Sequence, residues 1–313
     1  MDSDMVNYDV SLRGLWPALP TPLDERLNID AAAFASHALA MLEAGCVGVT
    51  PFGTTGEGPS FSVGERLLGL DGLVAAGVPA QRVLVSTSCA ALPDVIELTR
   101  HALALGAFGC LMLPPFFLKG VADQGVIDAY RCVVDTVADP RLRIVLYHIP
   151  QVCAVPLSPV VIRTLLTLYP DTIIGLKDSG CERETSLAFA HEFMPPLQVW
   201  VGNEPDVQAL AERGALGTVS GIANVLPQLV QRLVDDFNQP GAADDLQRVS
   251  GLLELLRKYG ITPALKAVLA IQHQRRAWLR VRPPLLALSD DQFERFAGEW
   301  REFAEGELPH SAA

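Results

Sequence analysis

Residues 172–178 read Thr172-Ile173-Ile174-Gly175-Leu176-Lys177-Asp178, a short apolar run that ends in two charged residues. The stretch that follows, residues 183–192, has helical periodicity, so the two together predict one strand followed by one helix. This strand-and-helix unit recurs along the chain. The predicted strands are residues 14–19, 48–52, 82–87, 109–113, 144–149, 172–177, 198–202 and 217–220.

Helical periodicity fills the stretches between these runs. Asp30 precedes the first predicted helix, and Ser62 with Glu65 three residues later has the pattern of a capping box at the second. The predicted helices are residues 31–43, 63–75, 92–105, 122–137, 159–168, 183–192, 206–213 and 225–237. Eight strands rich in Val, Ile and Leu, each followed by one helix, are typical of an α/β fold of the (β/α)8 TIM barrel type.

A doubly wound open sheet is the alternative fold. Doubly wound folds often carry a G-x-G-x-x-G turn after the first strand, and the chain has none there. The barrel pattern covers residues 1–237, and further helical patterns follow at residues 243–259, 263–276 and 290–304. No low-complexity linker separates the two parts. We therefore expect a barrel (1–237) with a C-terminal helical domain (238–313) packed on it.

Composition excludes several classes of protein. Half of the chain is apolar and 19% is charged, which indicates a globular protein with a large core. The formal charge of −12 argues against a nucleic-acid partner, because phosphates are bound by clustered Lys and Arg. No apolar run approaches the ~20 residues of a membrane span. The N-terminus, Met1-Asp2-Ser3-Asp4, lacks the basic and apolar parts of a signal peptide, so we expect a cytoplasmic protein.

The cysteines and histidines do not suggest a metal site. Both residue types are scattered singly, without a CxxC motif or a ligand-like Cys/His spacing. We expect the cysteines to be reduced, mostly in the core, and we expect no metal. The cysteines are Cys46, Cys89, Cys110, Cys132, Cys153 and Cys181.

Lys177 is the first candidate for chemistry, in a chain that has only four lysines beside twenty arginines. Burying an ammonium on a strand is costly unless the group is paired or neutralised. A buried lysine can therefore be held partly neutral, and a neutral amine attacks carbonyl groups. The alternative is a structural lysine that is paired with Asp178 or with a glutamate.

Other polar residues follow the predicted strands, where the chemistry of such barrels collects. Gly53-Thr54-Thr55-Gly56-Glu57 can hold a small anion with backbone N–H groups and hydroxyls, or it can be an ordinary turn with a helix cap. Tyr147 can relay a proton, or it can be a core tyrosine. Gly202 and Ser220 come at the ends of two later strands and are further candidates for substrate binding.

Together these residues match the needs of a Schiff base with a 2-oxo acid. That reaction requires an unprotonated amine (Lys177), a group that shuttles protons (Tyr147) and a seat for the carboxylate (Thr54 and Thr55). The resulting iminium withdraws electrons, so carbon–carbon bonds can be made or broken without a metal or a separate cofactor.

These motifs resemble a known family, the pyruvate-dependent class I aldolases that include dihydrodipicolinate synthase and N-acetylneuraminate lyase. The resemblance extends from about Gly14 to about Leu288. The matching segments are Gly53-Thr54-Thr55-Gly56-Glu57, Tyr147-His148-Ile149-Pro150, Gly175-Leu176-Lys177-Asp178, Ala223-Asn224-Val225 and Arg282-Pro283-Pro284-Leu285. The resemblance implies a TIM barrel with a C-terminal helical domain, Schiff-base chemistry on Lys177, a proton relay through Tyr147 and a homo-oligomer, usually a tetramer built as a dimer of dimers.

Two departures argue against dihydrodipicolinate synthase itself. The synthases carry a tyrosine, lent across a subunit interface, where this chain has Phe117. They also place an arginine a few residues after the Tyr147 position, and here Val152 replaces its bidentate grip on a carboxylate. Ser179 falls where the lyases place a threonine near the sugar-like part of their substrate, so it can bind a substrate hydroxyl or simply cap the next turn.

We therefore expect reversible aldol cleavage of a 4-hydroxy-2-oxo acid to pyruvate and an aldehyde. Dehydration of a 2-oxo-3-deoxy sugar acid through the same Schiff base is the second hypothesis, and a true dihydrodipicolinate synthase is a third. A catalytically silent ligand-binding barrel is the non-enzyme alternative. A sugar-phosphate barrel would bind phosphate at residues 217–223, but no basic residue lies near that loop in the sequence.

Overall fold

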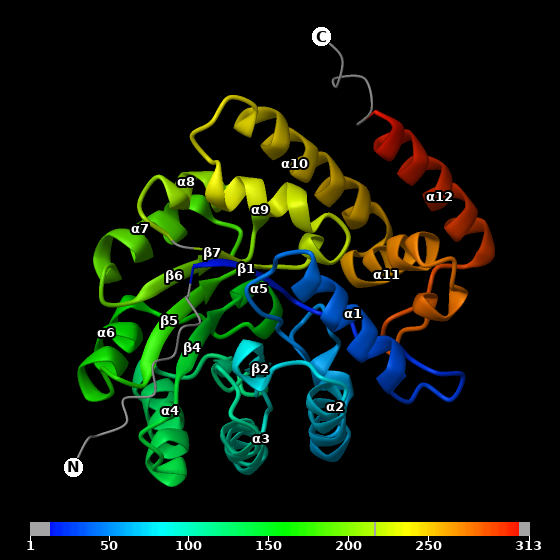
Figure 1. The fold of residues 1–313 in the computed structure, drawn as a ribbon. Helices are drawn as coiled ribbons and strands as arrows, with labels where there is room; N and C mark the ends of the chain where they lie inside the picture. Colours follow the sequence, from blue (N-terminus) through cyan, green and yellow to red (C-terminus); the bar gives the residue numbers. More distant parts are fainter. Residues whose placement is uncertain (1–12, 216, 307–313) are drawn as a thin grey trace.

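The computed structural model describes residues 13–215 and 217–306, in which a parallel sheet is surrounded by helices (Figure 1). The predicted N-terminus at residues 1–4 and the last residues of the predicted C-terminal domain, 307–313, lie outside the described residues. Seven strands pair in the order β1-β7-β6-β5-β4-β3-β2, all parallel. They are β1 (Gly14–Pro17), β2 (Leu84–Ser86), β3 (Gly109–Met112), β4 (Ile144–His148), β5 (Ile173–Asp178), β6 (Gln198–Val201) and β7 (Gly217–Ser220).

The predicted strand at residues 48–52 is not a regular strand. Thr50 forms an isolated parallel bridge with Ala18, and Val49 forms one with Val83. Ala18 follows β1 and Val83 precedes β2, so this segment connects the two edge strands of the sheet. The sheet is thus curled, and an α/β architecture is confirmed, whereas the prediction of eight regular strands is not.

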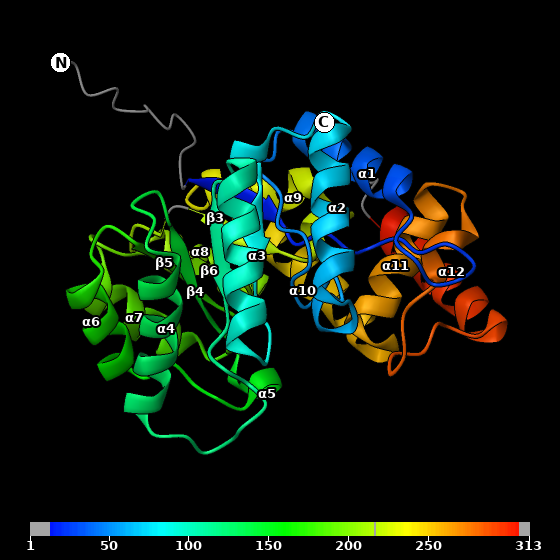
Figure 2. The same ribbon diagram turned by 90° about the horizontal axis from the view of Figure 1, so that it is seen from below.

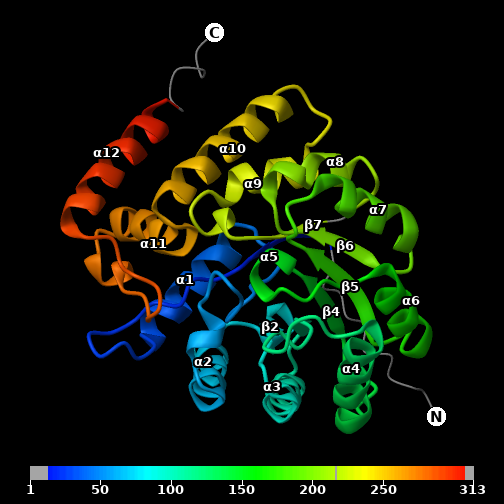
Figure 3. The same cartoon turned by 180° about the vertical axis from the view of Figure 1, so that it is seen from behind.

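Helices cover the outside of the curled sheet (Figures 1 and 3). They agree closely with the predicted ranges, and the differences lie at the ends of short helices and in α5, a single turn that was not predicted. These helices are α1 (Ala31–Glu43), α2 (Val63–Ala75), α3 (Leu92–Leu105), α4 (Asp123–Val137), α5 (Pro150–Cys153), α6 (Pro159–Leu168), α7 (Arg183–Phe193), α8 (Val207–Ala211) and α9 (Pro227–Asp235). The Ser62 capping box is present, because the Ser62 hydroxyl accepts from the Glu65 N–H while the Glu65 carboxylate accepts from the Ser62 N–H.

The strands point alternate side chains into the interior and outward to the helices, and nearly all of these side chains are buried, as in sheets covered by helices. Inside, the Trp16 ring stacks on the Trp200 ring with centroids 5.7 Å apart. Because the carboxyl ends of parallel strands meet at one end of the sheet, the residues after β4, β5, β6 and β7 come together there.

Three further helices follow the strand-and-helix units and group at one side of the sheet (Figures 1 and 2). They are α10 (Ala242–Tyr259), α11 (Ile261–Gln272) and α12 (Asp290–Glu305). Their buried leucines, among them Leu252, Leu256 and Leu265, belong to the same continuous core as the strands. These helices therefore share one hydrophobic core with the strands.

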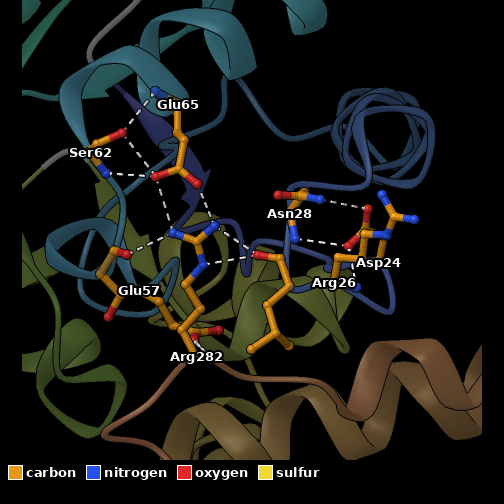
Figure 4. A network of polar contacts seen from close by, with 9 residues as sticks. Asp24, Arg26, Asn28, Glu57, Ser62, Glu65 and Arg282 are labelled. Atoms are coloured by element: carbon orange, nitrogen blue, oxygen red, sulfur yellow. Dashed lines mark hydrogen bonds and ion pairs between the residues drawn. The ribbon is translucent and has the colours of Figure 1, made fainter.

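Arg282 fastens the segment between α11 and α12 to the loop before α2 (Figure 4). Its guanidinium pairs with the Glu65 carboxylate, donates to the Ser60 carbonyl (2.8 Å) and the Leu27 carbonyl (2.7 Å), and lies 4.2 Å from the centroid of the Phe61 ring. The hydrogen bond from Arg282 lowers the pKa of Glu65 from 4.5 to about 2.

This pKa shift predicts an acid-sensitive contribution to stability. Glu65 binds a proton more weakly in the folded state, so its contribution is complete above pH 4.5 and is lost as the pH falls toward about 2. At pH 7 we expect Glu65→Gln to lower the free energy of unfolding by about 1 kcal/mol or less, because water screens a partly exposed pair. Urea midpoints of wild type and Glu65→Gln at pH 7 and pH 3 test this: the difference should shrink at pH 3. An equal difference at both pH values would contradict it.

Candidate active site

A cavity of about 360 Å³ opens at the carboxyl ends of β4, β5, β6 and β7. Most of its wall comes from the strand ends and the loops after them, and the rest comes from α10 and α11. The residues that line it are Thr54, Thr55, Tyr147, Ile149, Gln151, Val152, Lys177, Ser179, Cys181, Gly202, Asn203, Glu204, Val219, Gly221, Ile222, Leu253, Leu256, Arg257, Ile261, Thr262 and Leu265.

Lys177 and Tyr147 face each other across adjacent strands. They are partners in the register of β4 and β5, and Lys177 Nζ lies 4.4 Å from the centroid of the Tyr147 ring. Lys177 is only 5% exposed, and among the described residues its amine has neither a hydrogen bond nor an ion pair. The Asp178 carboxylate instead accepts from the Ser186 hydroxyl (2.5 Å) and from the Gly180 N–H (2.8 Å). The alternative of a structural lysine paired with Asp178 is therefore wrong.

Lys266 is the structural lysine of this chain. It is fully buried on α11, where its ammonium pairs with the Glu57 carboxylate and donates to the Arg280 carbonyl at 2.7 Å. Burial lowers the pKa of Lys266, and the neighbouring Glu57 opposes that shift. The two buried lysines thus differ in kind: Lys266 is paired within the core, whereas Lys177 is unpaired and lines a cavity.

The loop of residues 53–58 holds Thr54 and Thr55 at the cavity wall. The Gly58 N–H donates to the Gly53 carbonyl at 3.0 Å, and the Thr21 hydroxyl donates to the Gly56 carbonyl at 2.7 Å. A side chain at Gly58 would lie 1.8 Å from the Phe52 carbonyl oxygen, so this turn requires glycine.

Glu57 anchors the loop through its pair with Lys266, and it also accepts from the Arg282 N–H at 2.8 Å. Thr54 then reaches Tyr147, since the two hydroxyl groups share a hydrogen bond of 3.2 Å. The predicted carboxylate seat, the phenol and the amine therefore meet in one place.

Ser179 and Gly202 also line the cavity, as the sequence predicted. A Cβ at Gly202 would be 1.9 Å from Ser179 Oγ and 2.9 Å from Lys177 Cε. Position 202 therefore requires glycine, because any larger residue would clash with the side chains of Ser179 and Lys177.

Gly53 and Ser220 do not line the cavity, although the sequence suggested both. The Ser220 hydroxyl donates to Glu204 Oε1 at 2.6 Å and accepts from the Ala223 N–H at 3.0 Å. Its contacts in this structure are thus with Glu204 and the following turn. Gly53 contributes its carbonyl to the loop described above.

Several lining residues are not among the predicted site residues. Glu204 is buried, and its carboxylate accepts from Ser220 and from the Ile222 N–H. Gln151 belongs to the unpredicted turn α5 and donates to the Ser179 carbonyl at 2.6 Å. Arg257 and Thr262 come from the helices after the last strand, so only tertiary packing brings them to the site.

His148, beside Tyr147, points away from this chemistry. Its Nδ1 accepts from the Leu157 N–H at 3.1 Å, and burial lowers the pKa of the ring while Asp178 opposes that shift.

In residues 13–215 and 217–306 no group of three or more His, Cys, Asp or Glu could hold a metal ion. No helix in the same part of the chain is long and apolar enough to cross a membrane.

Comparisons with known proteins show which proteins the whole chain resembles. A model of the dihydrodipicolinate synthetase family matches residues 11–299. The chain is 32% identical, over 95% of its length and 99% of the relative's, to an "uncharacterized DapA-like lyase" of Chloroflexus aurantiacus. A dihydrodipicolinate synthase structure from Agrobacterium tumefaciens superimposes with a TM-score of 0.86 at 30% identity, covering 93% of this chain and 99% of that one. The N-acetylneuraminate lyase of Proteus mirabilis shares the fold, with a TM-score of 0.83 at 22% identity, covering 93% of this chain and 98% of that one.

Proposed function

Because the chain belongs to the dihydrodipicolinate synthetase family, we propose that it is a pyruvate-dependent lyase that forms a Schiff base on Lys177. The observation that carries this proposal is the unpaired amine of Lys177 on the cavity wall, beside the phenol of Tyr147. An amine of this kind is free to attack a carbonyl carbon.

The proposed reaction is cleavage of a 4-hydroxy-2-oxo acid. The Thr54 and Thr55 hydroxyls bind the 1-carboxylate, and the Lys177 amine adds to the C2 carbonyl. A proton moves from the nitrogen to the former carbonyl oxygen through Tyr147 and gives a neutral carbinolamine. A second proton, taken up from solvent through Tyr147, lets this oxygen leave as water and gives an iminium. The hydrogen bond between Tyr147 and Thr54 holds the phenol in place for that transfer.

The iminium then accepts the electron pair of the C3–C4 bond. The 4-hydroxyl loses its proton, the bond breaks, and an aldehyde leaves behind an enamine. Protonation of C3 and addition of water at C2 release pyruvate and restore the Lys177 amine. Each of these steps is reversible, so the same site can also form the carbon–carbon bond. The covalent lysine takes the place of a separate cofactor.

Dehydration of a 2-oxo-3-deoxy sugar acid is the second candidate. It uses the same iminium but expels a hydroxyl as water instead of breaking a carbon–carbon bond. Ser179 and Asn203 on the wall can bind substrate hydroxyls in either reaction. Dihydrodipicolinate synthesis is disfavoured because Val152 lines the cavity where the synthases have arginine, and because Phe117, 75% exposed, has no hydroxyl.

Product analysis on a panel of 4-hydroxy-2-oxo acids and 2-oxo-3-deoxy sugar acids tests the reaction type. Pyruvate and aldehyde in equal amounts, absent with Lys177→Met, support aldol cleavage. A product lighter by one water, with no pyruvate, would support the dehydratase instead. A stoichiometric complex with unchanged substrate would support the non-enzyme alternative, a barrel that binds without reacting.

Replacing Tyr147 with phenylalanine is expected to lower kcat by about 10²- to 10⁴-fold, the usual effect of losing a positioned proton donor. The Lys177 amine remains, so trapping of a slowly formed pyruvyl adduct should persist. Tyr259→Phe is the control, because that hydroxyl donates to Glu299 on the C-terminal helices, outside the cavity. An unchanged kcat in Tyr147→Phe would remove the tyrosine from the mechanism.

The proposal extends to the division of the chain into domains, its location in the cell and its oligomeric state. We propose that the described residues up to 237 form a closed (β/α)8 barrel in which residues 48–52 serve as the eighth strand, and that those from 238 to 306 form the helical domain packed on it. The protein is a cytoplasmic homo-oligomer, a tetramer or a dimer. The exposed apolar side chains of Phe117 and Leu118 support self-association, because such neighbouring groups gain from being covered.

A further inference from the structure

The cavity is larger than a pyruvyl group needs. Pyruvate would fill at most about half of it, even if each heavy atom took the ~30 Å³ of a liquid water molecule. Residues of α10 and α11 form part of the wall around the remaining space. These are Leu253, Leu256, Arg257, Ile261, Thr262 and Leu265. This part of the wall is apolar except for one guanidinium and one hydroxyl, and it is available to the part of the substrate beyond the pyruvyl unit.

Arg257 is the charged group on that wall. It is exposed, so it lies toward the opening of the cavity, and among the described residues its side chain has neither a hydrogen bond nor an ion pair. Its neighbour on α10, Lys258, is paired with Glu299 at 3.0 Å. An arginine without a carboxylate, in a chain with 36 acidic and 24 basic residues, is available to a ligand.

The ionisable residues of the cavity lining single out Arg257 as the group that can bind an anion. Lys177 and Arg257 are the basic residues of the lining, and Glu204 is the acidic one. The Glu204 carboxylate is already engaged by the Ser220 hydroxyl and the Ile222 N–H. Burial raises the pKa of the Cys181 thiol, although Arg257 opposes the shift, so this thiol adds no negative charge at neutral pH. Arg257 is thus the lining residue that keeps its positive charge while the Lys177 amine reacts, and its guanidinium is the group placed to bind an anion.

We propose that Arg257 binds a second carboxylate of the substrate, located at the end farthest from the 2-oxo group. This inference rests on the proposed function, since it takes the first carboxylate to lie at Thr54 and Thr55. One guanidinium can form two parallel hydrogen bonds with one carboxylate. A phosphate, with nearly twice the charge, fits less well because the surrounding wall of α10 and α11 is leucine and isoleucine. The substrate class is thus a 4-hydroxy-2-oxo diacid, and its aldehyde product carries a carboxylate.

Borohydride trapping of 2-oxo acids tests the inference without requiring turnover. The fraction of protein reduced to the covalent adduct is measured against ligand concentration for 2-oxoglutarate and 2-oxoadipate, each beside the 2-oxo monocarboxylate of the same chain length. In the wild type, the concentration for half-maximal trapping should be about 10- to 100-fold lower for at least one diacid than for the monocarboxylate of the same chain length. This ratio of concentrations is the range expected for hydrogen bonds to a charged group. Arg257→Gln should bring this ratio close to one, and Arg257→Lys should keep part of it.

Lys258→Gln is the matched control, because it removes the same charge from the next position of α10 without touching the cavity lining. It should leave the ratio unchanged. A wild-type ratio near one for both pairs, or a ratio that survives Arg257→Gln, overturns the assignment of Arg257 while pyruvate trapping still supports the Schiff base. If the wild type traps neither pyruvate nor any of the longer 2-oxo acids, the proposed function is overturned, and the assignment of Arg257 is overturned with it.

Discussion

Replacing Lys177 with methionine is expected to reduce kcat by at least about 10³-fold, as removal of a covalent nucleophile does in other enzymes. Methionine is close to lysine in length but has no amine, so the Schiff base cannot form. Because Lys177 is buried without a hydrogen bond or ion pair among the described residues, its replacement leaves no partner unsatisfied. We therefore expect unchanged or slightly higher stability together with the loss of activity. Turnover and the urea midpoint, measured on the same preparation, check both parts.

A clear loss of stability in Lys177→Met would show that the amine has a structural partner, contrary to this account. Retained turnover would remove Lys177 from the mechanism altogether. Lys119→Met is a suitable control, since Lys119 is an exposed lysine that donates to the Phe116 and Cys153 carbonyls and does not line the cavity.

The same substitution at Lys266 is expected to have the opposite outcome. Lys266→Met removes one partner of a fully buried ion pair and leaves the Glu57 carboxylate without its counter-charge, which costs about 3–5 kcal/mol of stability. Glu57 ends the turn that holds Thr54 and Thr55, so activity should fall as well. This loss should be smaller than in Lys177→Met, and pyruvate trapping on Lys177 should persist in the fraction that stays folded.

The double variant Lys266→Met with Glu57→Gln separates charge from packing. Removing both charges avoids the unpaired carboxylate, so we expect most of the lost stability to return. Urea midpoints of the wild type, the two single variants and the double variant form the cycle. If the double variant loses the sum of the two single losses, the pair is not coupled and Glu57 is not anchored in the way described.

The strand and helix pattern could be predicted from the sequence because each unit is short and has a clear period. The segment 48–52 has the composition of a strand, but it is held by isolated bridges on either side, a detail of register that periodicity does not contain. Membership of the dihydrodipicolinate synthetase family, suggested by the motifs, is confirmed, and the N-acetylneuraminate lyase structure shares the fold.

The candidate site was predictable only where its residues follow strands. Lys177, Tyr147, Thr54 and Thr55 come together as expected, because parallel strands deliver their carboxyl ends to one place. Arg257 was not predicted because α10 is brought to the cavity by the packing of its leucines. The sequence of α10 does not indicate which of its polar residues this packing places at the cavity. Ser220 was suggested by its position after a strand, yet its hydroxyl is taken up by Glu204, a contact that depends on side-chain geometry.

Mass spectrometry after reduction with borohydride in the presence of pyruvate tests the central claim most directly. We expect a pyruvyl adduct on the peptide that contains Lys177, formed by the wild type and by Lys266→Met but not by Lys177→Met. A folded wild-type protein that gains no adduct, or an adduct located on Lys119, Lys258 or Lys266, would contradict the assignment of Lys177 as the Schiff-base residue.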